Sequence, residues 1–235
     1  MAGILYIIAT PIGNLEDITL RAIRVLSEVD IILAEDTRVT KKLLDFLTTH
    51  HSLPTKHLLS YHQHSKDSRK LEILRYLVEG ENIALVTDAG TPGISDPGNE
   101  LIDFLLEKEP NIKIVPIPGA SAITSALSVS GFNVNKFLFI GFLPKKKRKK
   151  LFEWIKEGPS TGSGRTITFA FYESPKRILK TLEVLKEEFG EEKRILVARE
   201  MTKLHETLYR GTIEEVIKRL SNGVIKGEIV VVVEV

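Results

Sequence analysis

Short apolar runs alternate with amphipathic segments along most of the chain, and this alternation limits the possible folds more than any other feature. Apolar runs at residues 4–9, 30–34, 82–87 and 113–117 are typical of buried strands. The segments between them keep the apolar spacing of helices, as at residues 15–29. Strands that alternate with helices predict an α/β architecture.

The pattern begins again after Gly131, with strands predicted at 137–142, 166–172, 194–199, 207–211 and 228–235. Some of these runs follow one another with no helix between them, which favours a mixed sheet in the second half. A length of 235 residues corresponds to one or two domains of ordinary size. We therefore predict two α/β domains, residues 1–117 and 118–235.

Composition excludes several classes of protein. The chain has no cysteine, so disulfides, thiolate metal sites and cysteine nucleophiles are excluded. No apolar run reaches the roughly 18 residues that span a bilayer, and the N-terminus lacks the basic start of a signal peptide. We expect a cytoplasmic protein without a membrane segment. A net charge of +2 argues against a globally basic nucleic-acid binder but leaves local patches open.

Three glycine- and proline-containing loops follow predicted strands, at residues 10–14, 88–98 and 118–122. In open α/β sheets, ligands bind outside the carboxyl ends of the strands, so these loops are expected to converge on one crevice. Glycine lets the backbone approach a ligand closely, although the same residues also form ordinary turns. None of the loops matches a dinucleotide or P-loop fingerprint.

Seven short motifs resemble one family. They are, in chain order, ATPIGNLED at 9–17, AEDTR at 34–38, DAGTPGISDPG at 88–98, PGASA at 118–122, GFLP at 141–144, YESP at 172–175 and REMTK at 199–203. Together they resemble the ribosomal RNA small subunit methyltransferase I family, which belongs to the tetrapyrrole methylase superfamily. The resemblance extends over nearly the whole chain.

This resemblance implies 2′-O-methylation of a cytidine in 16S ribosomal RNA near the decoding site, with S-adenosylmethionine as the methyl donor. It also implies a donor site in the cleft between the two domains, and a homodimer that acts on 16S RNA or the 30S subunit. The residues that match the family's donor contacts are Pro11, Gly90, Thr91, Ile94, Ser121, Ala122, Tyr172 and Met201.

Two features depart from the family pattern. Residues 159–164 (PSTGSG) have the composition of a flexible linker and look inserted, as an engineered segment would. The chain ends at Val235, where family members usually continue into a small helical region. If that region grips RNA, we expect this chain to bind RNA weakly.

Methyl transfer to a hydroxyl needs no metal but benefits from a carboxylate or another base, because a hydroxyl is a poor nucleophile. The catalytic candidates are Asp17, Glu35, Asp36 and Glu173, with Glu16 and Asp88 also available. Asp17 and Asp36 could instead cap the helices that follow them. Glu173 could instead pair with Arg199 for structural reasons.

Six consecutive basic residues are predicted to bind RNA phosphates together with Arg38, although a charge run can also be a solvated face. They are Lys145, Lys146, Lys147, Arg148, Lys149 and Lys150. Histidines at 50, 51, 57, 62 and 64 lack the spacing of a metal site and are interpreted as a polar loop, with RNA contact and stacking by Tyr61 as the functional alternative. Trp154 is predicted to lie in the core.

Two other functions stay open at this point. One is a methyltransferase of the same superfamily that acts on a precorrin-type tetrapyrrole. The other is a non-catalytic RNA-binding protein with a vestigial donor pocket.

Overall fold

A computed structural model describes residues 2–146, 148–157 and 167–235 of the chain. The chain divides into two compact units, Met1–Ser121 and Ala122–Val235, which we describe separately. The sequence placed this division after residue 117, where the last strand of the first unit ends. Within the described residues, no helix has the length and apolar character needed to cross a membrane.

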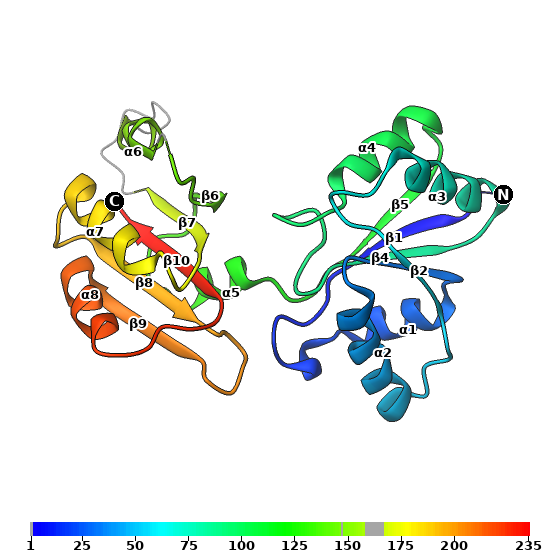
Figure 1. Ribbon diagram of the computed structural model, residues 1–235, viewed down its shortest axis with the longest axis horizontal. Helices are drawn as coiled ribbons and strands as arrows, with labels where there is room; N and C mark the ends of the chain where they lie inside the picture. Colours follow the sequence, from blue (N-terminus) through cyan, green and yellow to red (C-terminus); the bar gives the residue numbers. More distant parts are fainter. Residues whose placement is uncertain (1, 147, 158–166) are drawn as a thin grey trace. The chain divides into compact units, whose positions relative to one another are not determined.

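The first unit is a parallel sheet with helices on both faces (Figure 1). Its strands run in the order β3-β2-β4-β1-β5, and every pair is parallel. The strands are β1 (Ile4–Ile8), β2 (Ile31–Ala34), β3 (His57–Ser60), β4 (Ile83–Val86) and β5 (Lys113–Ile117). The helices are α1 (Leu20–Glu28) and α2 (Thr37–His51) on one face, and α3 (Asp67–Glu79) and α4 (Asn99–Lys108) on the other.

Alternate residues of the central strands enter two separate cores, as the two-residue period of a strand requires. In β2, Ile32 and Ala34 join the cluster under α1 and α2. Ile31 and Leu33 join the cluster under α3 and α4. A strand that is apolar on both faces is expected where helices cover both sides of a parallel sheet.

The helix predicted at residues 15–29 is wrong in its first part. Leu15–Asp17 is a short 3-10 turn that Asn14 caps, and α1 begins only at Leu20. The Thr19 side chain accepts a hydrogen bond from the Ala22 amide and fixes that start. Asp17 therefore does not cap α1, which corrects one of the two roles considered for it.

The second unit has a mixed sheet, as predicted, with strand order β6-β7-β10-β8-β9. Only the β6–β7 pair is parallel. The strands are β6 (Phe137–Phe142), β7 (Thr168–Glu173), β8 (Arg194–Arg199), β9 (Thr207–Thr212) and β10 (Ile229–Glu234). The helices are α5 (Ala122–Ser128), α6 (Arg148–Glu157), α7 (Ile178–Phe189) and α8 (Ile213–Ser221).

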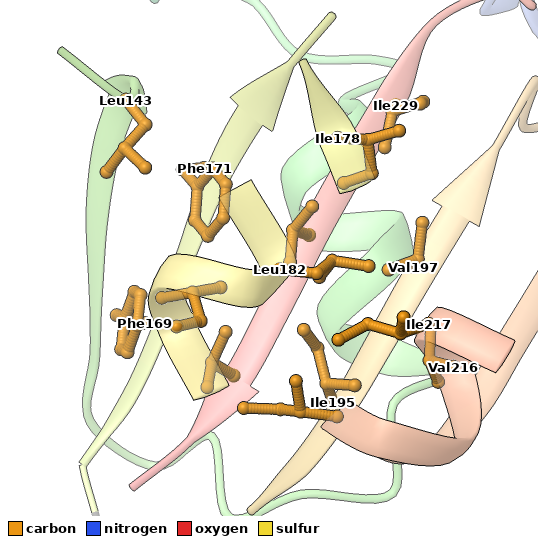
Figure 2. Packing of buried hydrophobic residues seen from close by; sticks show 14 of the residues in the cluster. Leu143, Phe169, Phe171, Ile178, Leu182, Ile195, Val197, Val216, Ile217 and Ile229 are labelled. Carbon is orange, nitrogen blue, oxygen red and sulfur yellow. The ribbon is translucent and has the colours of Figure 1, made fainter. Parts of the chain in front are cut away.

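The two faces of this sheet differ in the size of their side chains. Phe169 and Phe171 of β7 point toward α6, α7 and α8, where the largest core of the unit is packed (Figure 2). Ala170 of β7 and Ala198 of β8 point to the opposite face, which α5 covers. Trp154 of α6 joins neither core and is 53% exposed, so its predicted burial is wrong.

Candidate active site

The three glycine- and proline-containing loops follow β1, β4 and β5, which are neighbours in the first sheet. We call them the β1 loop (residues 10–14), the β4 loop (88–98) and the β5 loop (118–122). Thr10 and Gly90 exchange backbone hydrogen bonds of 2.8 and 3.0 Å, which join the first two loops. Thr91 Oγ1 donates to the Ala120 carbonyl at 3.3 Å and joins the third. The predicted convergence of the loops is confirmed.

The β4 loop owes its conformation mainly to glycine, although Ser95 is also left-handed, with φ +65°. Gly90, Gly93 and Gly98 have φ values of +88°, +82° and +150°, a region that side chains other than glycine rarely occupy. A Cβ atom on Gly93 would lie 2.6 Å from Asn99 Oδ1, so the loop is also closely packed there. Pro11 is buried beside this junction, whereas Ile94 is 48% exposed. Pro11, Gly90 and Thr91 thus lie on loops that touch one another.

Three carboxylates gather at the neighbouring ends of β2 and β4. The Asp36 amide donates to Asp88 Oδ1 at 3.1 Å. Glu35 Oε2 accepts hydrogen bonds from Thr87 Oγ1 at 2.5 Å and from the Asp88 amide at 3.4 Å. Two of the predicted catalytic residues, Glu35 and Asp36, are therefore held together with Asp88 at this edge of the sheet.

These carboxylates are stabilised to different degrees. Asp36 caps α2 and pairs with Arg38, and hydrogen bonds from the Arg38 side chain and amide lower the Asp36 pKa to about 2. The Asp88 pKa is instead raised, first by partial burial and then by the nearby charges of Glu35 and Asp36, against the opposing Asp36 amide. Asp17 is exposed on the 3-10 turn. The surroundings of Asp88 therefore favour its negative charge less than the surroundings of Asp36 favour the charge there.

Glu173 is buried and already bonded. Its carboxylate accepts from the Ser174 amide at 2.7 Å, from Thr181 Oγ1 at 2.7 Å and from Arg177 Nη2 at 3.0 Å. Arg199 instead donates to the His205 carbonyl and to Thr207, so the structural alternative for Glu173, a pair with Arg199, is wrong. An arginine four residues after the glutamate was the sequence signal that could have identified the true partner.

Three of the residues matched to the donor site lie on one face of the second sheet. Ala122, Tyr172 and Met201 all pack against the apolar cluster that α5 forms with β7, β8 and β10. The Tyr172 ring also contacts Phe139 and Phe142, each with a centroid distance of 5.3 Å. Sequence reasoning missed these two rings. The available signal was the aromatic residues of β6, since Phe139 lies just before GFLP and Phe142 lies within it.

Basic side chains precede and begin α6. Lys145, Lys146, Lys149 and Lys150 are exposed, and Arg148 Nε donates to the Pro144 carbonyl at 2.6 Å. The first turn of α6 contains no acidic residue, although the partial positive charge of a helix N-terminus favours one. The charge run is thus placed where it does not help the helix. Lys147 and the linker-like residues 159–164 lie outside the described residues.

The histidines do not form one loop. His50 and His51 belong to the last turn of α2, and His57 begins β3. Tyr61 is only 2% exposed, so the predicted stacking of its ring on RNA is wrong. Among the described residues, no group of three or more histidine, cysteine, aspartate or glutamate side chains could hold a metal ion.

Comparisons with known proteins agree with this geometry. Residues 4–217 match the sequence model of the Tetrapyrrole (Corrin/Porphyrin) Methylases. A protein of Halalkalibacterium halodurans named ribosomal RNA small subunit methyltransferase I is 45% identical over 99% of this chain and 76% of its own length. A protein of Thermotoga maritima with the same name is 45% identical over 98% of this chain and 97% of its own length.

The fold also matches solved structures. The uroporphyrin-III C-methyltransferase of Thermus thermophilus, in complex with S-adenosylhomocysteine, superposes with a TM-score of 0.66 at 16% identity. The match covers 98% of this chain and 97% of that one. An identity this low supports the fold and not the substrate.

Proposed function

The chain belongs to the tetrapyrrole methylase family and, within it, to the ribosomal RNA small subunit methyltransferase I group, and on this premise we propose that it methylates small-subunit ribosomal RNA with S-adenosylmethionine as donor. The observation that carries the proposal is the junction of three loops at the carboxyl edge of the first sheet, with a cluster of carboxylates beside it. Relatives above 40% identity that bear this name supply the substrate class.

The donor contacts are proposed on both units. In the first unit, Gly90 presents backbone with no side chain, and a Cβ built there would lie 3.5 Å from Ile12 Cγ2. Thr91, Ile94 and Pro11 are proposed to border the same position. In the second unit we assign donor contacts to Ala122, Tyr172 and Met201. Ser121, the last residue of the first unit, directly precedes α5 and is assigned a donor contact as well.

S-adenosylmethionine supplies a methyl group activated by a sulfonium. In the proposed reaction the ribose oxygen forms a bond to the methyl carbon, and the bond from that carbon to sulfur breaks. The hydroxyl must lose its proton during this step. We assign the proton to Asp88, because Asp36 is held by Arg38 and Glu35 by Thr87, while Asp88 has the raised pKa. Asp17, Glu35, Asp36 and Glu173 are thereby ranked below it.

The finer specificity, a cytidine 2′-hydroxyl in 16S RNA near the decoding site, is proposed from the sequence resemblance. The exposed lysines before and within α6 support an RNA partner over a tetrapyrrole, because phosphates are neutralised by such groups. Arg38, with 86% of its side chain exposed, is assigned a phosphate contact as well. A homodimer in the cytoplasm completes the proposal.

A methyl-transfer assay tests the reaction. The purified chain would be given tritiated S-adenosylmethionine with 30S subunits, naked 16S RNA or a precorrin. We expect label in RNA and at a ribose oxygen. Label on the precorrin alone would identify the tetrapyrrole alternative. If calorimetry detected no binding of S-adenosylhomocysteine, the non-catalytic RNA-binding alternative would replace the proposal.

A pair of double variants tests the RNA surface. Lys145→Ala with Lys146→Ala should weaken RNA binding and reduce the slope of log affinity against log salt by about 0.7–0.9 for each phosphate that the chain no longer neutralises. Lys180→Ala with Lys218→Ala removes the same charge from exposed positions on α7 and α8 and should leave the slope unchanged. Equal slopes for the two variants would refute the assignment.

A further inference from the structure

The loop that joins β8 to β9 holds two residues in an unfavourable backbone conformation. Glu200 and Thr202 have φ values of +52° and +65°, and Met201 lies between them. Residues other than glycine seldom adopt this left-handed region, and for the β-branched Thr202 it is an outlier. Such strain persists only where surrounding contacts impose it. We call residues 200–206 the β8–β9 loop.

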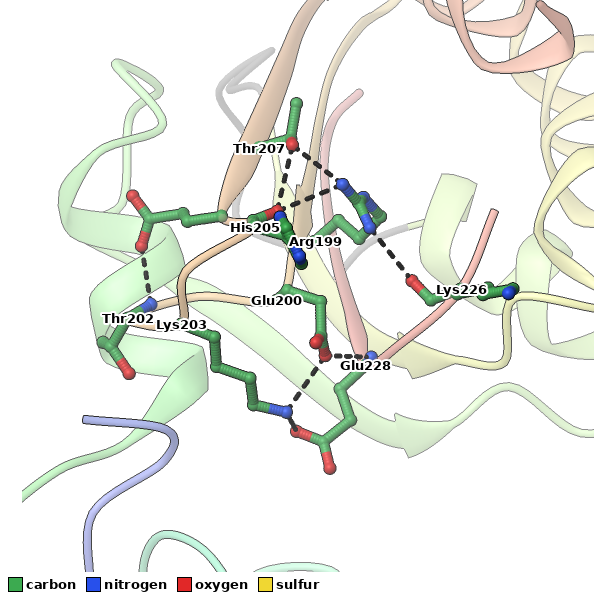
Figure 3. Close-up of polar contacts among 9 residues, drawn as sticks. Arg199, Glu200, Thr202, Lys203, His205, Thr207, Lys226 and Glu228 are labelled. Carbon is green, nitrogen blue, oxygen red and sulfur yellow. Dashed lines mark hydrogen bonds and ion pairs between the residues drawn. The ribbon is translucent and has the colours of Figure 1, made fainter. Parts of the chain in front are cut away.

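A cluster of charged side chains supplies those contacts (Figure 3). Lys203 Nζ lies 3.0 Å from Glu200 Oε1 and 3.0 Å from Glu228 Oε2. The Glu228 amide also donates to Glu200 Oε1 at 2.9 Å, and the Glu200 amide donates to the Glu228 carbonyl at 2.9 Å. The first left-handed residue is therefore tied to the segment that enters β10. We call Glu200, Lys203 and Glu228 the clamp.

The second left-handed residue has a tie of its own. The Thr202 amide donates to Glu206 Oε2 at 2.6 Å, which closes the loop on itself. The Arg199 guanidinium, at the end of β8, donates to the His205 carbonyl at 3.1 Å and to the Lys226 carbonyl at 3.3 Å. Both ends of the loop are thus fixed by hydrogen bonds to charged groups.

Gly227 makes room for the clamp. Its φ is +88°, and a Cβ atom built there would lie 2.2 Å from Glu200 Cδ and 2.3 Å from Glu200 Oε1. The Glu200 side chain therefore packs against the backbone of Gly227, which has no side chain. Any side chain at position 227 would push the glutamate out of the place from which it bonds Lys203.

Apolar burial does not hold the tip of the loop. Leu204 is 93% exposed, so the tip has no core contact of its own. Met201, by contrast, packs against the apolar cluster that Ala122 and Tyr172 also contact. The charged contacts thus fix the backbone on both sides of Met201, which is the one residue of the loop that we assign to the donor.

We propose that Glu200, Lys203 and Glu228 are positioning residues that keep the β8–β9 loop in the form that binds the methyl donor. The inference rests on the donor site proposed above, and it concerns residues that act through Met201 rather than by touching the reacting atoms. The strain is useful because the loop is then ordered before the donor arrives, and binding needs no further ordering.

Calorimetry with S-adenosylhomocysteine, together with steady-state kinetics, tests the proposal. Lys203→Met removes the shared cation and should raise the dissociation constant and the donor KM by about tenfold, with kcat at saturating donor nearly unchanged. Gly227→Ala should have the same effect by displacing Glu200. Lys203→Arg should restore most of the affinity, because it keeps the charge.

The control is Lys218→Met, which removes a more exposed cation of the same unit from its ion pair with Glu214 at 3.3 Å. It should leave the KM unchanged. A Lys203→Met variant that melts at the native temperature and binds S-adenosylhomocysteine as tightly as the native chain would overturn the positioning role alone. If the native chain itself did not bind, the proposed function would fail, and the positioning role with it.

Discussion

The β4 loop in the first unit and the β8–β9 loop in the second both contain left-handed residues, and both contain a residue that we assign to the donor. The β4 loop does so mainly with glycine, at Gly90, Gly93 and Gly98. The β8–β9 loop contains no glycine and relies on side-chain contacts instead. One conformation is thus encoded by residue type and the other by contacts between residues distant in sequence. The two loops should respond differently to substitution, salt and pH.

The largest expected effect is a loss of kcat when Asp88, at the start of the β4 loop, is substituted. It separates catalysis at this loop from donor binding at the β8–β9 loop. Asp88→Asn should lower kcat by about 10²–10⁴-fold, because the variant cannot accept the hydroxyl proton. Its affinity for S-adenosylhomocysteine should stay unchanged, the reverse of the pattern expected for Lys203→Met. Asp103→Asn, at an exposed position of α4, serves as the control. A kcat near the native value would make Glu35 and Asp17 the first candidates for the group that accepts the proton.

A second substitution tests whether glycine alone fixes the β4 loop. Gly98→Ala should lower the free energy of unfolding by about 1–3 kcal/mol, because it strains a residue with φ +150°. The new Cβ would also meet Gly93 N and Leu85 Cδ2, each at 3.2 Å. Urea denaturation measures the loss, which should not depend on salt. Gly223→Ala, where no atom lies within 4 Å of the added Cβ, should change the free energy of unfolding little.

The same contrast explains how much of the molecule could be predicted from sequence. The strands at Lys113–Ile117 and Arg194–Arg199 have the predicted bounds because their apolar runs are local, the first running from Lys113 to the residue before Pro118 and the second lying between two arginines. The start of α1 was missed because Leu15 and Ile18 keep helical spacing, while the Thr19 cap decides where the helix begins. Apolar periodicity thus predicts that a helix is present better than it predicts the residue at which the helix begins.

Contacts between distant residues set the rest of the site. The grouping of Asp36 with Asp88 depends on a hydrogen bond between residues 52 apart in sequence. Glu200 and Glu228 are 28 apart, and no motif suggested that they share Lys203. The predicted convergence of the loops, by contrast, needed only the rule that parallel strands present their carboxyl ends at one edge.

The pH dependence should distinguish the two loops through opposite pKa shifts. Hydrogen bonds from the Glu228 amide and from Lys203 lower the Glu200 pKa, although its partial burial acts against them. The clamp is therefore intact above the range in which an ordinary glutamate ionises, and it is lost as pH falls through the lowered Glu200 pKa. The Asp88 pKa is raised, so kcat should begin to fall at a higher pH than it would with an ordinary aspartate.

Steady-state kinetics and calorimetry across the acid range measure these two profiles. In Asp88→Asn the acid limb of kcat should disappear. In Lys203→Met the loss of donor affinity at low pH should be smaller, because the clamp is already broken. An acid limb of kcat that persisted in Asp88→Asn would contradict the assignment of the proton to Asp88.

The smallest expected effect concerns a left-handed residue that is not glycine and that the contacts of the β8–β9 loop do not hold. Ser52 follows α2 with φ +55° and lies outside both loops. Ser52→Gly should raise the free energy of unfolding by about 0.5–1 kcal/mol, because glycine adopts this conformation without strain. Thermal and urea denaturation would detect the gain. No gain would mean that the left-handed conformation alone is not a useful measure of strain in this chain.

The bare backbone at Gly227 has a consequence for how the sequence can change over time. Because the Glu200 side chain occupies the space that a Cβ would need, Gly227 cannot be replaced while Glu200 keeps its present position. We expect positions 200 and 227 to covary in an alignment of relatives, with a shorter residue at 200 wherever 227 is not glycine. Where glycine is replaced first, the compensating change should follow at position 200 or at its partner, Lys203.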